Sequence, residues 1–184
     1  QSFSHSSIDV GSLTAVVACT PAGFRRLVTP ACHAHSAVLP MAIFVSQPTF
    51  RKVAVLGAGV MGAQIAAHLV NVKVPVVLFD LPAKEGAKNS VVMKAIDGLK
   101  KLKPAPLGVL EDAALIQAAN YEEHLALLGE CDLIIEAIAE RMDWKLDLYQ
   151  KIAPHIAPHA IVASNTSGLS ITKLSEALPA EIKP

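Results

Sequence analysis

The chain has 184 residues, of which 52% are hydrophobic and 17% charged, and its formal net charge at pH 7 is zero. Because the charge is balanced and only 4% of residues are aromatic, the composition gives no support to nucleic-acid binding, which needs a basic face and stacking side chains. No apolar run approaches the roughly 20 residues that span a bilayer, so no membrane span is expected. Cys19, Cys32 and Cys131 are scattered without a C-x-x-C pair, which favours a reducing compartment over a disulfide scaffold.

Residues 1–50 do not resemble the folded domain that follows. They contain one acid, Asp9, several Ser and His, and no sustained periodicity. They are interpreted as an organellar transit peptide, as a small metal site, or as plain disorder or sequence read through in frame before a true start at Met41. The metal site is the least favoured because its ligands lack the usual paired spacing; they would be Cys19, Cys32, His33 and His35. We expect a poorly structured extension over 1–50 and one folded domain over 51–184.

A dinucleotide-binding pattern opens that domain. The apolar run Val53–Leu56 breaks into Gly57-x-Gly59-x-x-Gly62. In such a pattern the first glycine permits a tight turn, the second lets the backbone approach a pyrophosphate, and the third allows a helix to pack closely on the strand. The helix-like stretch 63–70 would direct its unpaired N-terminal N–H groups at the anion.

The second predicted strand, Val76–Phe79, ends at Asp80. A carboxylate at this place accepts hydrogen bonds from both hydroxyls of an adenosine ribose and repels a 2′-phosphate. The next residues are Leu81 and Pro82, with no arginine to receive such a phosphate. The sequence therefore predicts NAD rather than NADP. A second role for Asp80, as the N-cap of a helix after Pro82, is compatible with ribose binding.

Strand-like and helix-like segments alternate through the rest of the chain. We predict helical segments over 83–103, 111–115, 122–128 and 142–153, and strands near 115–119, 133–138 and 160–163. This alternation is typical of a doubly wound parallel α/β sheet of the Rossmann type, with strand order 3-2-1-4-5-6.

The carboxyl ends of strands 1, 4 and 5 share one rim of such a sheet. The Gly57 turn, the exit Ile138-Ala139-Glu140 and the exit Ser164–Gly168 would meet there. Glu140 and Ser167 would then lie near the nicotinamide half of a bound NAD. A serine that follows a strand is often only a helix cap or turn residue, so both interpretations of Ser167 stay open.

Four segments together resemble the N-terminal domain of 3-hydroxyacyl-CoA dehydrogenases, over about residues 51–181. They are Val53–Gly62, Asp80, Asp132–Lys145 and Ser164–Ser167. The detail is most similar to the large multifunctional β-oxidation proteins of bacteria. The pattern E-A-I-x-E with a lysine five residues on, followed by S-N-T-S, is more discriminating than the glycines.

The resemblance implies roles for individual residues. Met61 and Asp80 would contact NAD, Ile138 to Glu140 would line its nicotinamide side, and Lys145 would bind it from the following helix. Ser167 would be the catalytic-site residue that hydrogen-bonds the C3 oxygen of the substrate. The implied cofactor-binding set is Gly57, Gly59, Met61, Gly62, Asp80, Ile138, Ala139, Glu140, Lys145 and Ser167.

The basic residues could also be surface residues without a role in binding. Lys145 and Arg141 could belong to a solvated helix face. Lys100 and Lys103, with Lys101 between them, could attract the phosphates of coenzyme A, but they could equally be surface residues that aid solubility.

The resemblance also implies a histidine general base in an H-F-F-N-P strand, a motif that this sequence does not contain. We therefore expect a piece of a longer enzyme, cut before the last strand or strands and a helical second domain, and inactive alone. The histidines expected to be structural or exposed instead are His68, His124, His155 and His159.

The implied function is NAD-dependent oxidation of L-3-hydroxyacyl-CoA to 3-ketoacyl-CoA in fatty-acid β-oxidation. The longer protein would be a cytoplasmic homo-oligomer, or a mitochondrial matrix protein if 1–50 is a transit peptide. Alternatives are another Rossmann β-hydroxyacid dehydrogenase and a non-catalytic NAD-binding protein.

Overall fold

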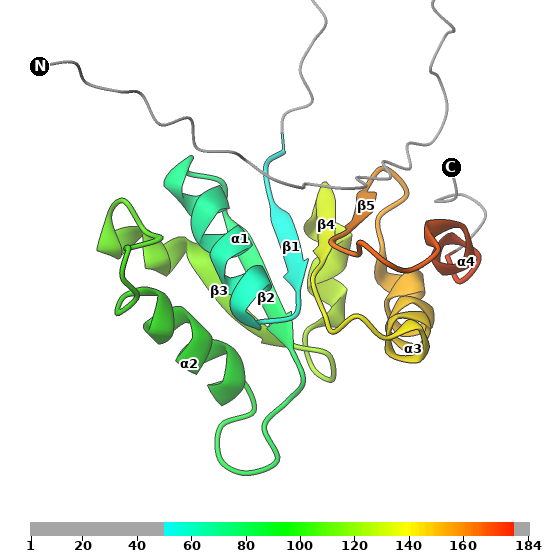
Figure 1. Ribbon diagram of the computed structural model, residues 1–184, viewed down its shortest axis with the longest axis horizontal. Coiled ribbons are helices and arrows are strands. Elements are labelled where there is room, and N and C mark those ends of the chain that lie inside the picture. The colour runs from blue at the N-terminus through cyan, green and yellow to red at the C-terminus, as the bar shows by residue number, and fades with distance from the viewer. Residues whose placement is uncertain (1–49, 179–184) are drawn as a thin grey trace, which may run out of the picture.

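The computed structural model of the chain describes residues 50–178, and Figure 1 shows its arrangement. The interpretations of the N-terminal extension, including the start at Met41 and the metal site, concern residues that lie outside this range, as does the end of the predicted domain. Within it, five strands form one sheet in the order β3-β2-β1-β4-β5. Their bounds are β1 (Val53–Leu56), β2 (Val76–Asp80), β3 (Ile116–Asn120), β4 (Leu133–Glu136) and β5 (Ile161–Ser164).

Every neighbouring pair of strands in this sheet is parallel, which confirms the doubly wound Rossmann-type fold. The helices between the strands are α1 (Val60–Asn71), α2 (Ser90–Leu99) and α3 (Met142–Ile152), and α4 (Ile171–Ser175) follows β5. Three shorter 3₁₀ segments are η1 (Leu110–Leu115), η2 (Leu125–Glu130) and η3 (Ala153–His155). No helix among the described residues has the length and hydropathy needed to cross a membrane.

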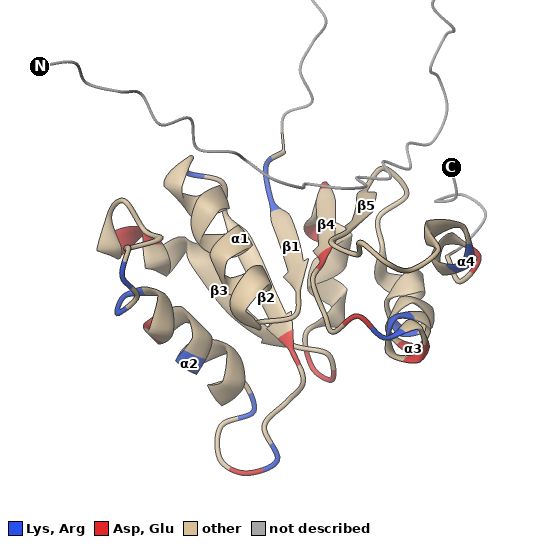
Figure 2. Ribbon diagram, viewed as in Figure 1, with Lys and Arg blue, Asp and Glu red and all other residues tan. Residues whose placement is uncertain are grey.

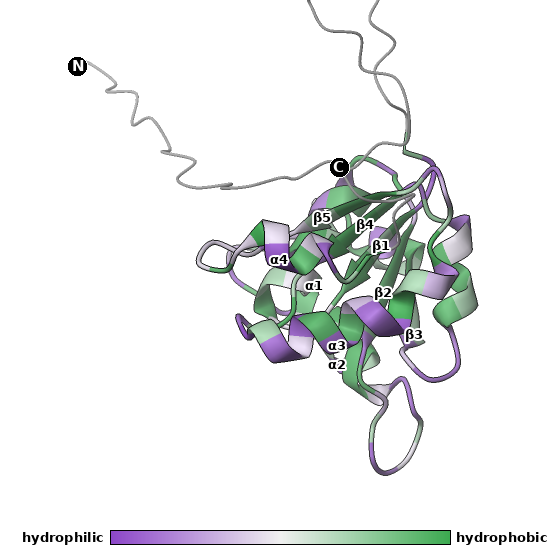
Figure 3. Ribbon diagram, turned by 90° about the vertical axis from the view of Figure 1, so that its right-hand side faces the viewer, coloured by the Kyte–Doolittle hydropathy of each residue, from purple (hydrophilic) through white to green (hydrophobic). Residues whose placement is uncertain are grey.

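The central strand β1 is fully buried because both faces of the sheet are covered. Successive side chains of a strand point to opposite faces. Val53 and Val55 accordingly belong to the core under α1 and α2, whereas Ala54 and Leu56 belong to the core under α3. Figure 3 shows the same concentration of hydrophobic residues on the strands. A continuous apolar run, rather than an alternating one, is what a doubly covered parallel strand requires.

Charged residues surround this core, and one of them, Asp80, lies at the carboxyl end of a strand. Figure 2 shows Lys, Arg, Asp and Glu chiefly on helices and loops around the sheet, with both signs mixed. Asp80 closes β2 at the same end of the sheet as the turn between β1 and α1. Asp80 and the glycine turn therefore both lie at the carboxyl ends of the strands.

The helix predicted over 83–103 is wrong in its extent. Helix α2 begins only at Ser90, and Gly86 in the preceding loop has a φ of +76° that a right-handed helix does not use. The N-cap role of Asp80 is wrong for the same reason, since the N-cap position of α2 is Asn89.

The strand predicted over 133–138 also ends early, at Glu136. The Ile138 amide donates to the Glu136 carboxylate, at 2.7 Å, rather than to a neighbouring strand. The short helix predicted over 122–128 is instead the 3₁₀ segment η2, which begins three residues later.

Candidate functional site

The glycine turn between β1 and α1 has the shape of a phosphate cradle. Gly57 has a φ of +103°, and a Cβ on it would lie 2.8 Å from the Ala137 carbonyl oxygen. A Cβ on Gly62 would overlap the Gly57 carbonyl oxygen, whereas a Cβ on Gly59 would meet nothing within 4 Å. Gly57 and Gly62 are thus required by packing inside the protein. Gly59 faces open space beside the N-terminus of α1, where backbone N–H groups lack helical partners and an anion fits.

Asp80 connects the end of β2 to this cradle. One carboxylate oxygen, Oδ2, accepts a hydrogen bond of 2.7 Å from the Ala58 amide, and Oδ1 accepts one of 2.7 Å from the Leu81 amide. Each oxygen of an ionised carboxylate has a second lone-pair site, so hydroxyl donors can still be bound. The residues present therefore fit a dinucleotide whose pyrophosphate lies at Gly59 and whose ribose reaches Asp80.

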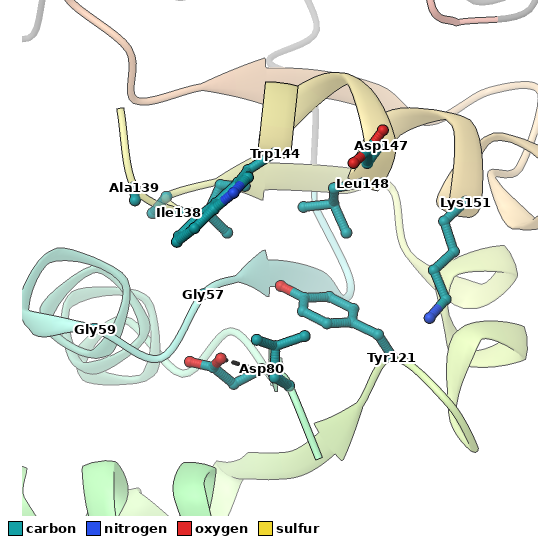
Figure 4. Close-up of a pocket in the computed structure, with 12 residues that line it drawn as sticks. Gly57, Gly59, Asp80, Tyr121, Ile138, Ala139, Trp144, Asp147, Leu148 and Lys151 are labelled. Carbon is teal, nitrogen blue, oxygen red and sulfur yellow. Dashed lines mark hydrogen bonds between the residues drawn. The ribbon is translucent and has the colours of Figure 1, made fainter. Parts of the chain in front are cut away.

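A pocket of about 430 Å³ opens next to Asp80 and the glycine turn. Figure 4 shows Asp80 and Tyr121 on one side of it and Trp144 and Leu148, from α3, on the other. Its lining is mostly apolar and comprises Gly57, Gly59, Asp80, Leu81, Tyr121, Ala137, Ile138, Ala139, Trp144, Asp147, Leu148 and Lys151. An apolar cleft with a few polar groups in its lining is typical of small-molecule sites.

Glu140 lies with the serine-rich segment after β5. Its Oε1 accepts hydrogen bonds from Thr166 Oγ1 at 2.5 Å, from the Ser167 amide at 3.0 Å and from the Gly168 amide at 2.9 Å. These donors, the Thr166 hydroxyl above all, lower the pKa of Glu140 to about 2, with a smaller contribution from the Lys145 charge. The structure therefore brings together the β4 and β5 exits that the sequence placed on one rim.

Ser167 is exposed, and its side chain makes no hydrogen bond with any other described residue. Its amide is held by Glu140, which leaves the hydroxyl free to meet a ligand at the rim. Met61 is also exposed, in the first turn of α1. Whether Met61, Ser167 or the other members of the predicted set contact NAD stays a prediction.

Lys145 does not lie on a solvated helix face, and that interpretation is wrong. Its side chain is fully buried, and Nζ lies 2.7 Å from both carboxylate oxygens of Glu136 and 3.7 Å from Glu140 Oε2. Glu136, also fully buried, accepts further hydrogen bonds from Ser164 Oγ at 2.6 Å and from the Ile138 amide at 2.7 Å. This network ties β4, β5 and α3 together directly beneath the rim.

Arg141, by contrast, is exposed and pairs with Asp143. The interpretation of a solvated side chain therefore suits Arg141, though its guanidinium also lies over the ring of Trp144.

The lysines proposed for coenzyme A lie away from the pocket. Lys100 and Lys103 are exposed after the C-terminal end of α2, and Lys100 pairs with Asp97. The next segment is bonded to Asn71 at the C-terminal end of α1, whose other end carries the glycine turn. This placement supports the surface interpretation, and the coenzyme A role stays a prediction.

Sequence reasoning missed Tyr121, Trp144 and Glu136. Tyr121 is only 4% exposed, and its hydroxyl has no hydrogen-bond partner among the described residues. Burial first, and then the negative charges of Asp80 and Glu136, raise the pKa of Tyr121 well above its usual value. An acid inside an apolar strand was the one available signal for Glu136. None of the histidines among residues 50–178 lines the pocket.

The sequence matches a known family over most of its length. The model of the "3-hydroxyacyl-CoA dehydrogenase, NAD binding domain" family covers residues 52–183. The "putative fatty acid oxidation complex trifunctional enzyme" of Rickettsia felis is 44% identical over 138 residues, which are 74% of this chain and 19% of that protein. The "probable 3-hydroxyacyl-CoA dehydrogenase" of Bacillus subtilis is 37% identical, over 68% of this chain and 18% of its own length.

Solved structures agree with the sequence relatives. The crystal structure of (S)-3-hydroxybutyryl-CoA dehydrogenase from Ralstonia eutropha matches with a TM-score of 0.58 and 29% identity, over 72% of this chain and 47% of that one. The chain spans about a fifth of the length of the curated relatives named above. The glycine cradle, Asp80 and these matches together show that the chain belongs to the NAD-binding domain family of 3-hydroxyacyl-CoA dehydrogenases.

Proposed function

We propose that this domain holds NAD across the rim of the sheet and that, within a longer protein, it takes part in oxidising L-3-hydroxyacyl-CoA to 3-ketoacyl-CoA. The observation that carries the proposal is the contact between the Asp80 carboxylate and the Ala58 amide, beside the open space at Gly59. The carboxylate that would bind the ribose is thus joined directly to the turn that would bind the phosphates. The names of the relatives support the choice of substrate class.

The chemistry would take place at the other end of the rim. When bound, NAD supplies the acceptor for the hydride that leaves C3 of the substrate. Ser167 would donate a hydrogen bond to the C3 oxygen, because its hydroxyl is exposed and its backbone is fixed by Glu140. A donor already held in place stabilises charge on that oxygen without first having to be oriented.

Lys145 would act beneath the surface in this proposal. Its ammonium is enclosed by Glu136 and Glu140, so it would fix the orientation of Glu140 and reach the cofactor only if the Glu140 side chain moved. The histidine base implied by the resemblance would come from a segment outside residues 50–178.

Cofactor binding is tested by calorimetry on the 184-residue chain with NADH and NADPH. We expect NADH to bind more tightly, and Asp80→Ala to weaken NADH by roughly 10- to 100-fold, since hydrogen bonds to a charged group contribute about 1.5–3 kcal/mol. The same variant should relax discrimination against NADPH, because a carboxylate no longer repels the 2′-phosphate. Unchanged affinity and preference in Asp80→Ala would remove the ribose role.

The substrate class needs the longer protein. If the longer protein oxidises 3-hydroxybutyryl-CoA with NAD but does not oxidise free 3-hydroxybutyrate, the proposed acyl-CoA substrate class is supported. The reverse preference would favour another β-hydroxyacid dehydrogenase. We further propose that the longer protein is cytoplasmic, because the relatives named above come from bacteria, and that it is a homo-oligomer, as the resemblance implies. Cell fractionation and sedimentation test these two points, and a mitochondrial location would instead support the transit peptide.

A further inference from the structure

The single tryptophan of the chain, Trp144, stands at the pocket beside Asp80. The residue is 51% exposed, although it is carried by α3, whose neighbouring Leu148 is buried in the core. An exposed indole forgoes the burial of a large apolar area. At the mouth of an apolar pocket, a flat ligand would recover that burial.

The indole is already held on one face. The Arg141 guanidinium lies 4.5 Å from the centre of the Trp144 ring, within the range of a cation–π contact. Asp143 in turn fixes Arg141 through Nε at 3.1 Å and Nη2 at 2.5 Å. This arrangement restrains the ring before any ligand arrives, and Arg141 itself does not line the pocket.

The opposite wall is aromatic as well. Tyr121 projects from the end of β3 towards the pocket, and its ring is stacked on Phe79 with centroids 5.9 Å apart. Figure 4 shows Trp144 reaching in from α3 on one side and Tyr121 from the other, with Asp80 nearby. Two rings and several aliphatic side chains thus enclose a slot that suits a planar, weakly polar group.

The position of Asp80 selects which planar group this is. A carboxylate at the end of the second strand binds the ribose of the adenosine, and the adenine is attached to that ribose. Ser167 and Glu140, which would meet the nicotinamide half, do not line the pocket. The slot therefore belongs to the adenine end.

We propose that Trp144 stacks on the adenine of the bound dinucleotide, with Arg141 on its outer face and Tyr121 on the far side of the slot. This assignment rests on the proposed binding of NAD and adds the residue that receives the base. Stacking of the adenine on an aromatic side chain does not need the nicotinamide, so adenosine-containing fragments of the dinucleotide should bind in the same way.

The test uses the fluorescence of the sole tryptophan. ADP-ribose is titrated into the 184-residue chain, because it carries the adenine and pyrophosphate but has no reduced nicotinamide to accept excitation energy. We expect saturable quenching of Trp144 by ADP-ribose and none by nicotinamide mononucleotide. Quenching by the mononucleotide alone would overturn the assignment, since the nicotinamide would then occupy the slot.

Calorimetry with ADP-ribose provides the second readout. Trp144→Leu should weaken binding by about tenfold, and Trp144→Phe should keep most of the affinity because a ring remains. Leu110→Ala is a matched control, because Leu110 is also 51% exposed but lies in η1 away from the pocket, and it should leave the affinity unchanged.

Two results would contradict the assignment in different ways. If ADP-ribose binds without quenching and Trp144→Leu binds it as tightly as the native chain, the stacking role is wrong while NAD binding stands. If neither ADP-ribose nor NADH binds the folded chain, the proposed function fails and the assignment fails with it.

Discussion

The buried pair of Lys145 and Glu136 offers the sharpest test of how the rim is held together. At 2.7 Å, two unit charges attract by about 6 kcal/mol at an effective dielectric constant of about 20. Much of this attraction is offset by the cost of taking both groups out of water. The pair therefore adds little net stability, but the loss of one partner leaves the other charged and buried.

Lys145→Met is the perturbation that isolates this effect. Breaking a buried ion pair usually costs about 3–5 kcal/mol. Glu136 would still accept hydrogen bonds from Ser164 and from the Ile138 amide, so we expect the lower part of that range, about 3 kcal/mol. Urea unfolding followed by circular dichroism measures the change, provided that the slope of the transition stays constant.

Two further variants make the result interpretable. Lys100→Met removes a surface ion pair with Asp97, so it should cost less than about 1 kcal/mol. The double variant Glu136→Gln with Lys145→Met removes both charges and should recover much of the lost stability, even if Lys145→Met alone fails to fold. A loss in Lys145→Met no larger than that in Lys100→Met, or a double variant less stable than Lys145→Met, would refute the reasoning.

Three other predictions concern the cradle and the rim. Gly62→Ala should strongly destabilise the fold, because the new Cβ would overlap the Gly57 carbonyl oxygen. Gly98→Ala lies inside α2, where a Cβ would meet nothing within 4 Å, and should stabilise the fold by about 0.5–1 kcal/mol. Thermal melts compare the two variants, and equal melting temperatures would show that Gly62 is not required by packing. The pKa of Glu140 is lowered to about 2 in the folded protein, so its contribution to stability is present above the ordinary pKa of about 4.5 and is lost as the pH falls towards 2. In Glu140→Gln the melting temperature should fall less steeply between pH 5 and pH 2 than in the native chain. A fall as steep as that of the native chain would show that Glu140 does not cause the pH dependence. Ser167→Ala in the longer protein should lower kcat severely with little change in NAD affinity, and normal turnover would remove Ser167 from the site.

The fold was largely predictable because its signals are local. Apolar runs such as Val53–Leu56 locate the buried strands, and right-handed crossovers then leave few possible orders for the sheet. The glycine turn and Asp80 were predictable because the turn itself dictates the spacing of its glycines. The start of α2 was not, because it depends on the left-handed conformation adopted at Gly86.

The parts of the site that escaped prediction depend on contacts between distant elements. Tyr121 and Trp144 meet at one pocket only because β3 ends at the same rim from which α3 starts. The burial of Lys145 likewise could not be predicted, because the sequence of α3 does not distinguish it from an exposed basic residue such as Lys151. It follows from the placement of Glu136 in a strand that is covered on both faces.

Every role assigned to this domain depends on the binding of one nucleotide by the glycine turn and Asp80. A crystal structure of the chain with NAD⁺ bound tests it most directly. We predict pyrophosphate oxygens within hydrogen-bond distance of the backbone at Gly59 and the first turn of α1, and both adenosine ribose hydroxyls on the Asp80 carboxylate. A dinucleotide bound elsewhere, or one whose ribose lies beyond hydrogen-bond reach of Asp80, would contradict this binding mode.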